Sequence, residues 1–175
     1  MKRLMSIVAL CVASLSIGRI SEAKGVPDLG LRDVAGHSQK LSEWRGQVVV
    51  LSFWATWCAP CREELPRLSE LNEEFAGRNV HFVAVSIDDA KDRAKIEPYL
   101  LKQNIHLDVW VGGNADLLGR FGLGDVVPAT LVLDEQGQVI TRIMGEARNE
   151  DVRRPLDWLL SGRQGPPPEQ KLKRY

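Results

Sequence analysis

The stretch Phe53-Trp54-Ala55-Thr56-Trp57-Cys58-Ala59-Pro60-Cys61 places two cysteines three positions apart, where an apolar strand pattern ends and a helical pattern begins. In the first turn of a helix, unpaired backbone N–H groups and the helix dipole favour the thiolate, the form of cysteine that attacks a disulfide. Cys61, one turn further along, is close enough to form a disulfide with Cys58 and to expel a partner bound to it. We therefore predict a redox-active pair in which Cys58 attacks and Cys61 resolves.

The patterns on either side of the cysteines predict a strand, a helix and a second strand. Residues 47–54 form a continuous β-branched and aromatic run, typical of a strand buried on both faces. The apolar residues that follow recur at spacings of three and four, which predicts an amphipathic helix ending near Gly77: Leu65, Leu68, Leu71 and Phe75. Glu63, Glu64 and Arg62 are assigned to its solvated face. Because residues 80–87 form another strand pattern, we expect a parallel pair with a right-handed crossover.

The remaining patterns continue the alternation of strands and helices. They predict an edge hairpin over 24–46, a strand over 107–111, a helix over 115–121, and antiparallel strands over 126–134 and 139–144. They also predict a helix over 91–104 that Pro98 kinks or divides. A closing helix reaches residue 160, and Pro155 limits where it can start. Residues 161–175, rich in proline and charge, are predicted to be a disordered tail.

The N-terminal residues have the features of a targeting segment. Lys2 and Arg3 precede an almost entirely apolar run over residues 4–17, and Ser21-Glu22-Ala23 offers a small-x-small cleavage site. We predict that residues 1–23 form a cleaved signal peptide that directs export to the periplasm. The alternative is an uncleaved N-terminus that tethers the protein to the membrane, although the apolar run is short for a spanning helix.

The cysteine count and the charge narrow the function further. Removal of residues 1–23, which hold three of the 23 basic and one of the 23 acidic residues, leaves a formal charge of −2. Such a balance predicts no basic face for nucleic acid. Cys11 would leave with the signal peptide, so the mature chain would keep only Cys58 and Cys61. Two cysteines are too few for a disulfide scaffold in an oxidising compartment and fit a working redox pair.

These motifs resemble those of the thioredoxin superfamily, specifically its exported TlpA/ResA/CcmG-like thiol-disulfide oxidoreductases. Trp57-Cys58-Ala59-Pro60-Cys61 resembles the family's W-C-x-P-C sequence, with Trp54 shortly before it. Pro66 lies where thioredoxins kink the active-site helix. Val127-Pro128-Ala129-Thr130 resembles the cis-proline loop, and Gly145 matches a glycine near the end of the last strand. The resemblance covers roughly residues 26–160.

The resemblance implies an α/β, thioredoxin-like fold in which helices flank a central mixed β-sheet. Residues 24–160 would form this domain, with an N-terminal β-hairpin extension over 26–46 and a central insertion within 87–122. A cis bond at Pro128 would turn the Val127 backbone toward the cysteines, where it pairs with an extended substrate segment. Trp57 is a second candidate substrate contact, and the residues that shape the site would be Trp54, Pro60, Pro66 and Gly145.

Ser52 is a departure from thioredoxin, which has a buried aspartate at the matching position as proton acceptor for the inner cysteine. A serine hydroxyl is not a useful base near neutral pH, so another group is needed. The TlpA/ResA-like branch offers an acidic residue after the next strand, and Asp89, or its neighbour Asp88, is the match here. The alternative role for Asp89 is that of a helix-capping residue near Lys91.

We interpret the chain as a monomeric enzyme that reduces disulfides in exported proteins without a cofactor or metal, and that a membrane thiol-disulfide electron donor reduces in turn. The direction follows from Ala59 and Pro60. A histidine between the cysteines would stabilise the thiolate strongly and produce an oxidant, whereas these residues add neither charge nor donor. Candidate substrates are the haem-binding thiols of apocytochromes, in cytochrome c maturation, or the cysteines of copper sites.

Two other functions use the same residues. A copper-binding assembly factor would use Cys58 and Cys61 as soft ligands with a histidine, but none of the three histidines lies beyond His106. A thiol peroxidase would need a P-x-x-x-T-x-x-C arrangement, which is missing because Thr56 lies two residues before Cys58.

Overall fold

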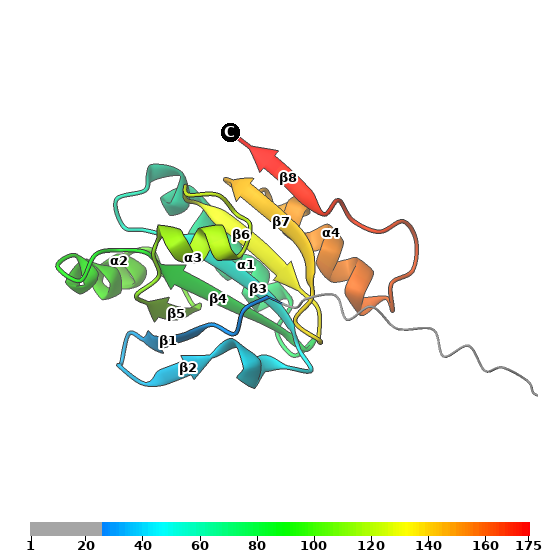
Figure 1. The fold of residues 1–175 in the computed structure, drawn as a ribbon, viewed down its shortest axis with the longest axis horizontal. Helices are drawn as coiled ribbons and strands as arrows, with labels where there is room; N and C mark the ends of the chain where they lie inside the picture. The colour runs from blue at the N-terminus through cyan, green and yellow to red at the C-terminus, as the bar shows by residue number, and fades with distance from the viewer. Residues whose placement is uncertain (1–25) are drawn as a thin grey trace, which may run out of the picture.

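A mixed sheet of eight strands forms the centre of the protein in the computed structural model, which describes residues 26–175 (Figure 1). The strands are β1 (Gly30–Asp33), β2 (Ser38–Lys40), β3 (Val48–Trp54), β4 (Val80–Ser86), β5 (Asp108–Val111), β6 (Ala129–Leu133), β7 (Val139–Gly145) and β8 (Lys171–Arg174). The helices are α1 (Ala59–Glu74), α2 (Ile96–Lys102), α3 (Ala115–Arg120) and α4 (Asn149–Leu160), with 3₁₀ turns η1 (Leu41–Trp44) and η2 (Arg93–Lys95). The sheet order is β2-β1-β5-β4-β3-β6-β7-β8.

The central strand β3 is buried along its whole length, as its continuous apolar run predicts. It pairs in parallel with β4 from Val48 opposite Val80 to Trp54 opposite Ser86. On its other side it pairs antiparallel with β6, where Ser52 lies opposite Thr130. The parallel β3–β4 pair joined through α1 is confirmed, and with it the thioredoxin-like α/β fold.

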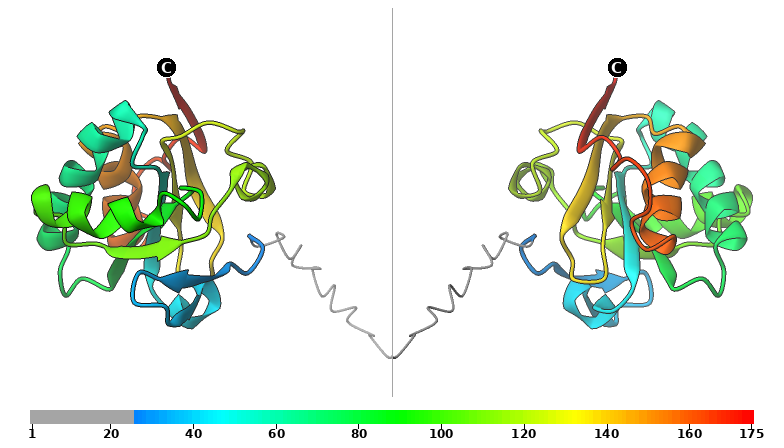
Figure 2. Two further views of the ribbon diagram at one scale, coloured as in Figure 1. Left: turned by 90° about the vertical axis from the view of Figure 1, so that its left-hand side faces the viewer. Right: turned by 90° about the vertical axis from the view of Figure 1, so that its right-hand side faces the viewer.

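Helices cover both faces of the sheet (Figure 2). Val48 and Val50 point to one face, where α1 and α4 pack against them in a shared apolar cluster. Val49 and Leu51 point to the other face, which α3 covers. This alternation of side chains along a strand gives each face its own core, so the sheet is shielded on both sides.

The N-terminal hairpin agrees with prediction, and the segment between β4 and β6 agrees in part. β1 pairs antiparallel with β2 and, at its other edge, with β5, so the hairpin extends the sheet. The helical segment predicted over 91–104 is divided into η2 and α2, but the division lies before Ile96 and not at Pro98, as the prediction had it. Pro98 lies in the first turn of α2, where a missing backbone N–H leaves no helical bond unmade.

The prediction that Pro155 limits the start of the closing helix is wrong. α4 begins at Asn149 and continues through Pro155, which is buried. The start is fixed instead by Asp151, whose carboxylate accepts a hydrogen bond of 3.0 Å from the Arg148 N–H. The helix therefore tolerates one absent backbone bond because its first turn is capped and its apolar face is packed.

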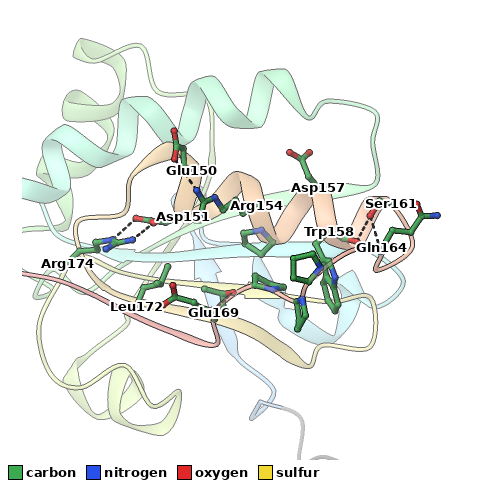
Figure 3. A pocket seen from close by; sticks show the side chains of 15 residues that line it. Glu150, Asp151, Arg154, Asp157, Trp158, Ser161, Gln164, Glu169, Leu172 and Arg174 are labelled. Atoms are coloured by element: carbon green, nitrogen blue, oxygen red, sulfur yellow. Dashed lines mark hydrogen bonds and ion pairs between the residues drawn. The ribbon is translucent and has the colours of Figure 1, made fainter.

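The prediction of a disordered tail over residues 161–175 is also wrong, because this segment returns to the sheet as β8. It runs parallel to β7, from Lys171 opposite Arg142 to Arg174 opposite Gly145. Figure 3 shows how the Arg174 guanidinium meets the Asp151 carboxylate, over 2.6 and 2.9 Å. Without β8, the backbone groups of β7 would form an open sheet edge. Pairing at that edge gives a proline-rich, charged segment its order.

A cavity of about 700 Å³ lies between α4 and the returning segment (Figure 3). Trp158 and the proline run over residues 166–168 contribute to its walls. None of its lining residues comes from the cysteine pair or from the loop before β6. This cavity therefore belongs to the C-terminal half of the fold.

The predicted signal peptide, residues 1–23, lies outside the described part of the chain, as does Cys11. Export therefore stays a prediction. Among residues 26–175, no helix combines the length and apolar character needed to cross a membrane.

Candidate active site

The two cysteines lie at the N-terminus of α1, joined by a disulfide with an S–S length of 2.02 Å and a Cα–Cα distance of 5.3 Å. Cys58 is the N-cap residue, and its Sγ accepts a hydrogen bond from the Cys61 N–H over 3.2 Å. Pro60 is at the second helical position, where a backbone N–H would have no acceptor within the helix, so its missing N–H costs no helical hydrogen bond. After reduction, the same N–H and the helix dipole would stabilise a thiolate on Cys58.

The cysteine pair differs in access to solvent. Cys58 is 5% exposed, whereas Cys61 is fully buried. Trp54, also fully buried, belongs to the same apolar cluster and shields the disulfide from inside. Trp57 is 63% exposed and therefore free to contact another molecule. Of the two cysteines, Cys58 is therefore the one with some access to solvent.

The loop before β6 lies beside the cysteines, with a cis peptide bond between Val127 and Pro128. Val127 packs against the cluster that contains Cys58 and Cys61. The Pro128 carbonyl accepts a hydrogen bond from the Gly145 N–H over 2.9 Å, which ties the loop to the end of β7. Pro60 and Pro128 line one pocket, so the loop and the active-site helix face the same space.

Glu64 contradicts the assignment of both glutamates to a solvated helix face. Glu63 is exposed, but Glu64 is only 1% exposed. Its carboxylate accepts hydrogen bonds from the hydroxyls of Ser52 and Thr130, each over 3.0 Å, and from the Ala147 N–H over 2.6 Å. Glu64 therefore places a buried carboxyl group beside Ser52, the residue that matches the buried aspartate of thioredoxin.

Two signals in the sequence indicate this position. Glu64 follows Cys61 by three residues and precedes Leu68 by four, so helical periodicity places it on the apolar stripe of α1 rather than opposite it. In addition, Ser52 and Thr130 are hydroxyl residues in the middle of apolar strands. Buried hydroxyls need hydrogen-bond partners, and the carboxylate supplies one to both.

Burial raises the pKa of Glu64 from an ordinary 4.5 to about 7. The hydrogen bonds from Ala147, Thr130 and Ser52 and the charge of Arg67 lower the pKa and offset part of this effect. A carboxyl group in this range exchanges its proton near neutral pH. It lies on the same face of α1 as Cys61, within one helical turn.

This shift predicts a pH dependence of stability that depends on Glu64. Between pH 4.5 and 7 the folded chain keeps the Glu64 proton and the unfolded chain releases it, so the free energy of unfolding falls as pH rises through this window. The loss reaches roughly 3 kcal/mol and is complete above about pH 7. Urea unfolding of the oxidised protein from pH 4 to 8 is expected to show this fall relative to Glu64→Gln. Parallel curves for the two proteins would contradict it.

The two aspartates after β4 have different surroundings. Asp88 is buried and accepts hydrogen bonds from the Thr56 N–H, the Thr56 hydroxyl and the Ser86 hydroxyl. It therefore fixes the loop that precedes Cys58. Asp89 is exposed, and its carbonyl accepts a bond from the Asp92 N–H at the turn before η2. A role for Asp89 in catalysis stays a prediction, and its exposure does not favour one.

Pro66 and Gly145 lie where the resemblance implies. Pro66 lies within α1 and has no backbone N–H, so the Arg62 carbonyl lacks its helical hydrogen-bond donor. The Tyr99 hydroxyl donates to this carbonyl instead, over 3.5 Å. Gly145 ends β7 with a φ of +93°, and a Cβ there would come within 2.4 Å of the Arg174 carbonyl oxygen. Only glycine fits both the backbone conformation and the close approach of β8.

Comparison with known proteins places this site in a family. Residues 23–142 match the AhpC/TSA family. The chain belongs to this family. The thiol-disulfide oxidoreductase ResA of Geobacillus kaustophilus is 31% identical over 131 residues, covering 75% of this chain and 74% of the relative. The thioredoxin-like protein YneN of Bacillus subtilis is 32% identical over 144 residues, covering 79% and 80%.

Solved structures similar to this AhpC/TSA family protein lead to the same assignment as the relatives found by sequence. A thiol:disulfide interchange protein of the thioredoxin family from Chlorobium tepidum superposes with a TM-score of 0.66 and 26% identity, covering 78% of this chain and 95% of that one. The chain is thus a thiol-disulfide oxidoreductase of thioredoxin-like fold. Within residues 26–175, no three His, Cys, Asp or Glu side chains are grouped to hold a metal ion.

Proposed function

We propose that this AhpC/TSA family member reduces disulfides in exported proteins. The observation that carries the proposal is the unequal access of the two sulfurs: Cys58 lies at the surface end of α1, facing the loop of Val127 and Pro128, while Cys61 is enclosed. An enzyme of this class needs one sulfur that meets the substrate and a second that waits behind it.

The reaction proceeds in two exchanges. The Cys58 thiolate attacks one sulfur of the substrate disulfide, and the other substrate sulfur leaves as a thiolate that takes up a proton. Cys61, after losing its proton, attacks the Cys58 sulfur and releases the second substrate thiol. Two electrons thus pass from the Cys58–Cys61 dithiol to the substrate. The substrate disulfide is reduced to two thiols, and the enzyme dithiol is oxidised to a disulfide.

Glu64 is the group that would accept the Cys61 proton in the second exchange. It is buried, lies one turn from Cys61 on the same face of α1, and has a pKa of about 7. A base with a pKa near the working pH is the most effective proton acceptor. The hydroxyls of Ser52 and Thr130 hold the carboxylate in place in either protonation state.

The direction of transfer follows from what surrounds Cys58. Ala59 and Pro60 bring no charge or side-chain donor between the cysteines. The ionised Glu64 disfavours a second negative charge nearby, which makes the dithiol easier to oxidise. We expect a reduction potential nearer to the about −270 mV of thioredoxin than to the about −120 mV of a strong oxidant.

The cellular setting continues the same proposal. Export through residues 1–23 would bring the enzyme to the periplasm, where a membrane thiol-disulfide donor reduces it again after each turnover. The substrate classes we propose are the haem-binding cysteines of apocytochromes and the cysteines of copper sites. Both kinds of cysteine must be reduced before they bind haem or copper. Monomeric action requires only the residues already described at the site.

Pro128→Ala is expected to lower kcat/KM for a peptide disulfide by about tenfold or more, because the substrate backbone loses its alignment with Cys58. Both cysteines should remain titratable after reduction. Stopped-flow measurement with the reduced protein checks this, with a thiol count as control. An unchanged kcat/KM would remove Pro128 from the binding site.

The proposal is tested by mixing the reduced chain, freed of reductant, with one equivalent of a peptide disulfide. We expect two peptide thiols to appear for each Cys58–Cys61 disulfide formed. Equilibration with dithiol buffers then gives the reduction potential. Failure of transfer, or a potential near about −120 mV, would overturn a reductase function.

A further inference from the structure

A second pocket adjoins the active site, and β8 supplies one of its walls. Its volume is about 640 Å³. Pro60 lines it from the active-site helix, Val126 and Pro128 from the cis-proline loop, and Tyr175 from the residue after β8. Segments about 115 residues apart in the sequence thus meet beside Cys58 and Cys61.

Several contacts hold the end of β8, the residue before Tyr175, in place. Arg174 forms two hydrogen bonds with Asp151, at 2.6 and 2.9 Å, and Asp151 is 8% exposed. The Arg174 backbone pairs with Gly145, whose missing side chain lets the two strands approach. Gly145 in turn donates to the Pro128 carbonyl. An unbroken series of contacts therefore joins β8 to the cis-proline loop.

The pocket is lined by apolar residues together with three charged ones, Asp125, Glu146 and Arg174. In residues 26–175, five large hydrophobic side chains are exposed. Val126, at 50%, and Tyr175, at 82%, line this pocket, and Trp57, at 63%, precedes Cys58. Two of the five exposed apolar side chains thus lie in one pocket, which favours a binding surface there.

We propose that Tyr175, held by β8, forms one wall of a subsite for an apolar side chain adjacent to the substrate cysteine. The inference rests on the proposed function, because it assigns a substrate preference to the same site. Val127 has no hydrogen bond to its N–H or C=O within the described residues, so its backbone is free to pair with an extended chain. A substrate segment paired there directs alternate side chains toward Val126, Pro128 and Tyr175.

β8 lies outside the region that carries the family match, which ends at residue 142. The subsite thus combines shared parts, Pro60 and Pro128, with a wall from a segment beyond that match. Such a wall would change the relative affinity for different substrates and would leave the chemistry of the cysteines unchanged.

The test uses the full chain in its reduced form and two oxidised peptide dimers that differ only beside the cysteine, with leucine in one and serine in the other. The readout is the ratio of kcat/KM for the leucine peptide to that for the serine peptide. We expect a ratio of about ten in the unsubstituted chain and a ratio near one in Tyr175→Ala, because an apolar contact contributes about this much discrimination.

Three further variants make the result specific. Tyr175→Phe keeps the apolar wall and should keep the ratio. Leu101→Ala removes a side chain of nearly the same exposure, 81% against 82% for Tyr175, from α2 and should keep the ratio too. Asp151→Asn weakens the attachment of Arg174 and should lower the ratio without changing Tyr175 itself.

The outcomes separate the two proposals. Equal rates for both peptides in the unsubstituted chain, or a ratio retained in Tyr175→Ala, would overturn the subsite and leave the reductase intact. If the unsubstituted chain reduced neither peptide nor a small aromatic disulfide, the proposed function would fail and the subsite with it.

Discussion

Cys61→Ser is expected to accumulate a covalent complex with its substrate, because the mixed disulfide on Cys58 forms but has no second thiol to resolve it. Residues 26–175 contain no third cysteine that could take over the role of Cys61. Non-reducing electrophoresis and mass spectrometry, after mixing with a peptide disulfide, should show the peptide attached to Cys58. Release by a reductant would confirm the bond type.

Cys58→Ser is the matched control. A serine hydroxyl at the N-cap is not ionised near neutral pH, so disulfide reduction should be abolished and no complex should form. Both variants nearly keep the size of the side chain, and Cys58→Ser also keeps a side chain that can cap α1. Equal residual activity in the two variants, or a complex trapped in Cys58→Ser, would contradict the assigned order of attack.

Glu64→Gln is expected to slow the second exchange by about 100-fold or more, the usual contribution of a positioned proton acceptor. Glutamine keeps the shape of the side chain and its capacity to bond with Ser52, Thr130 and Ala147, but it accepts no proton. The first exchange, which depends on the Cys58 thiolate, should change much less. Rapid-quench measurement of mixed-disulfide decay separates the two steps.

Asp89→Asn and Glu63→Gln serve as controls, because both carboxylates are exposed. In the unsubstituted chain, mixed-disulfide decay should accelerate as pH rises through about 7, where Glu64 loses its proton. This profile should persist in both controls and disappear in Glu64→Gln. Loss of the profile in Asp89→Asn alone would return the proton acceptor to the residue that the family resemblance implies.

The central part of the fold was predictable because its signals are local. The apolar run before Cys58 and the leucines after it are close in sequence, and each pattern determines its own element. The cis-proline loop was identified only through resemblance, since spacing alone does not bring Pro128 to Cys58. Antiparallel pairing of β3 with β6 is what joins them.

Glu64 and β8 show where local patterns fail. Two adjacent glutamates look like a solvated pair, yet successive helix residues differ by about 100° in direction, so one is buried and the other exposed. The burial of Glu64 also depends on a hydrogen bond from Thr130, which is 66 residues away in the sequence. β8 has the composition of a tail, and its order comes from the edge of β7 and from Asp151, neither of which is visible in residues 161–175.

The most direct test of the account is the rate at which iodoacetamide alkylates each thiol of the fully reduced chain between pH 5 and 9, with the sites identified by mass spectrometry. The account predicts that Cys58 reacts faster than free cysteine at pH 7 and keeps this advantage well below pH 8.5, while Cys61 stays almost unmodified. Alkylation of Cys58 no faster than free cysteine, or preferential alkylation of Cys61, would contradict it.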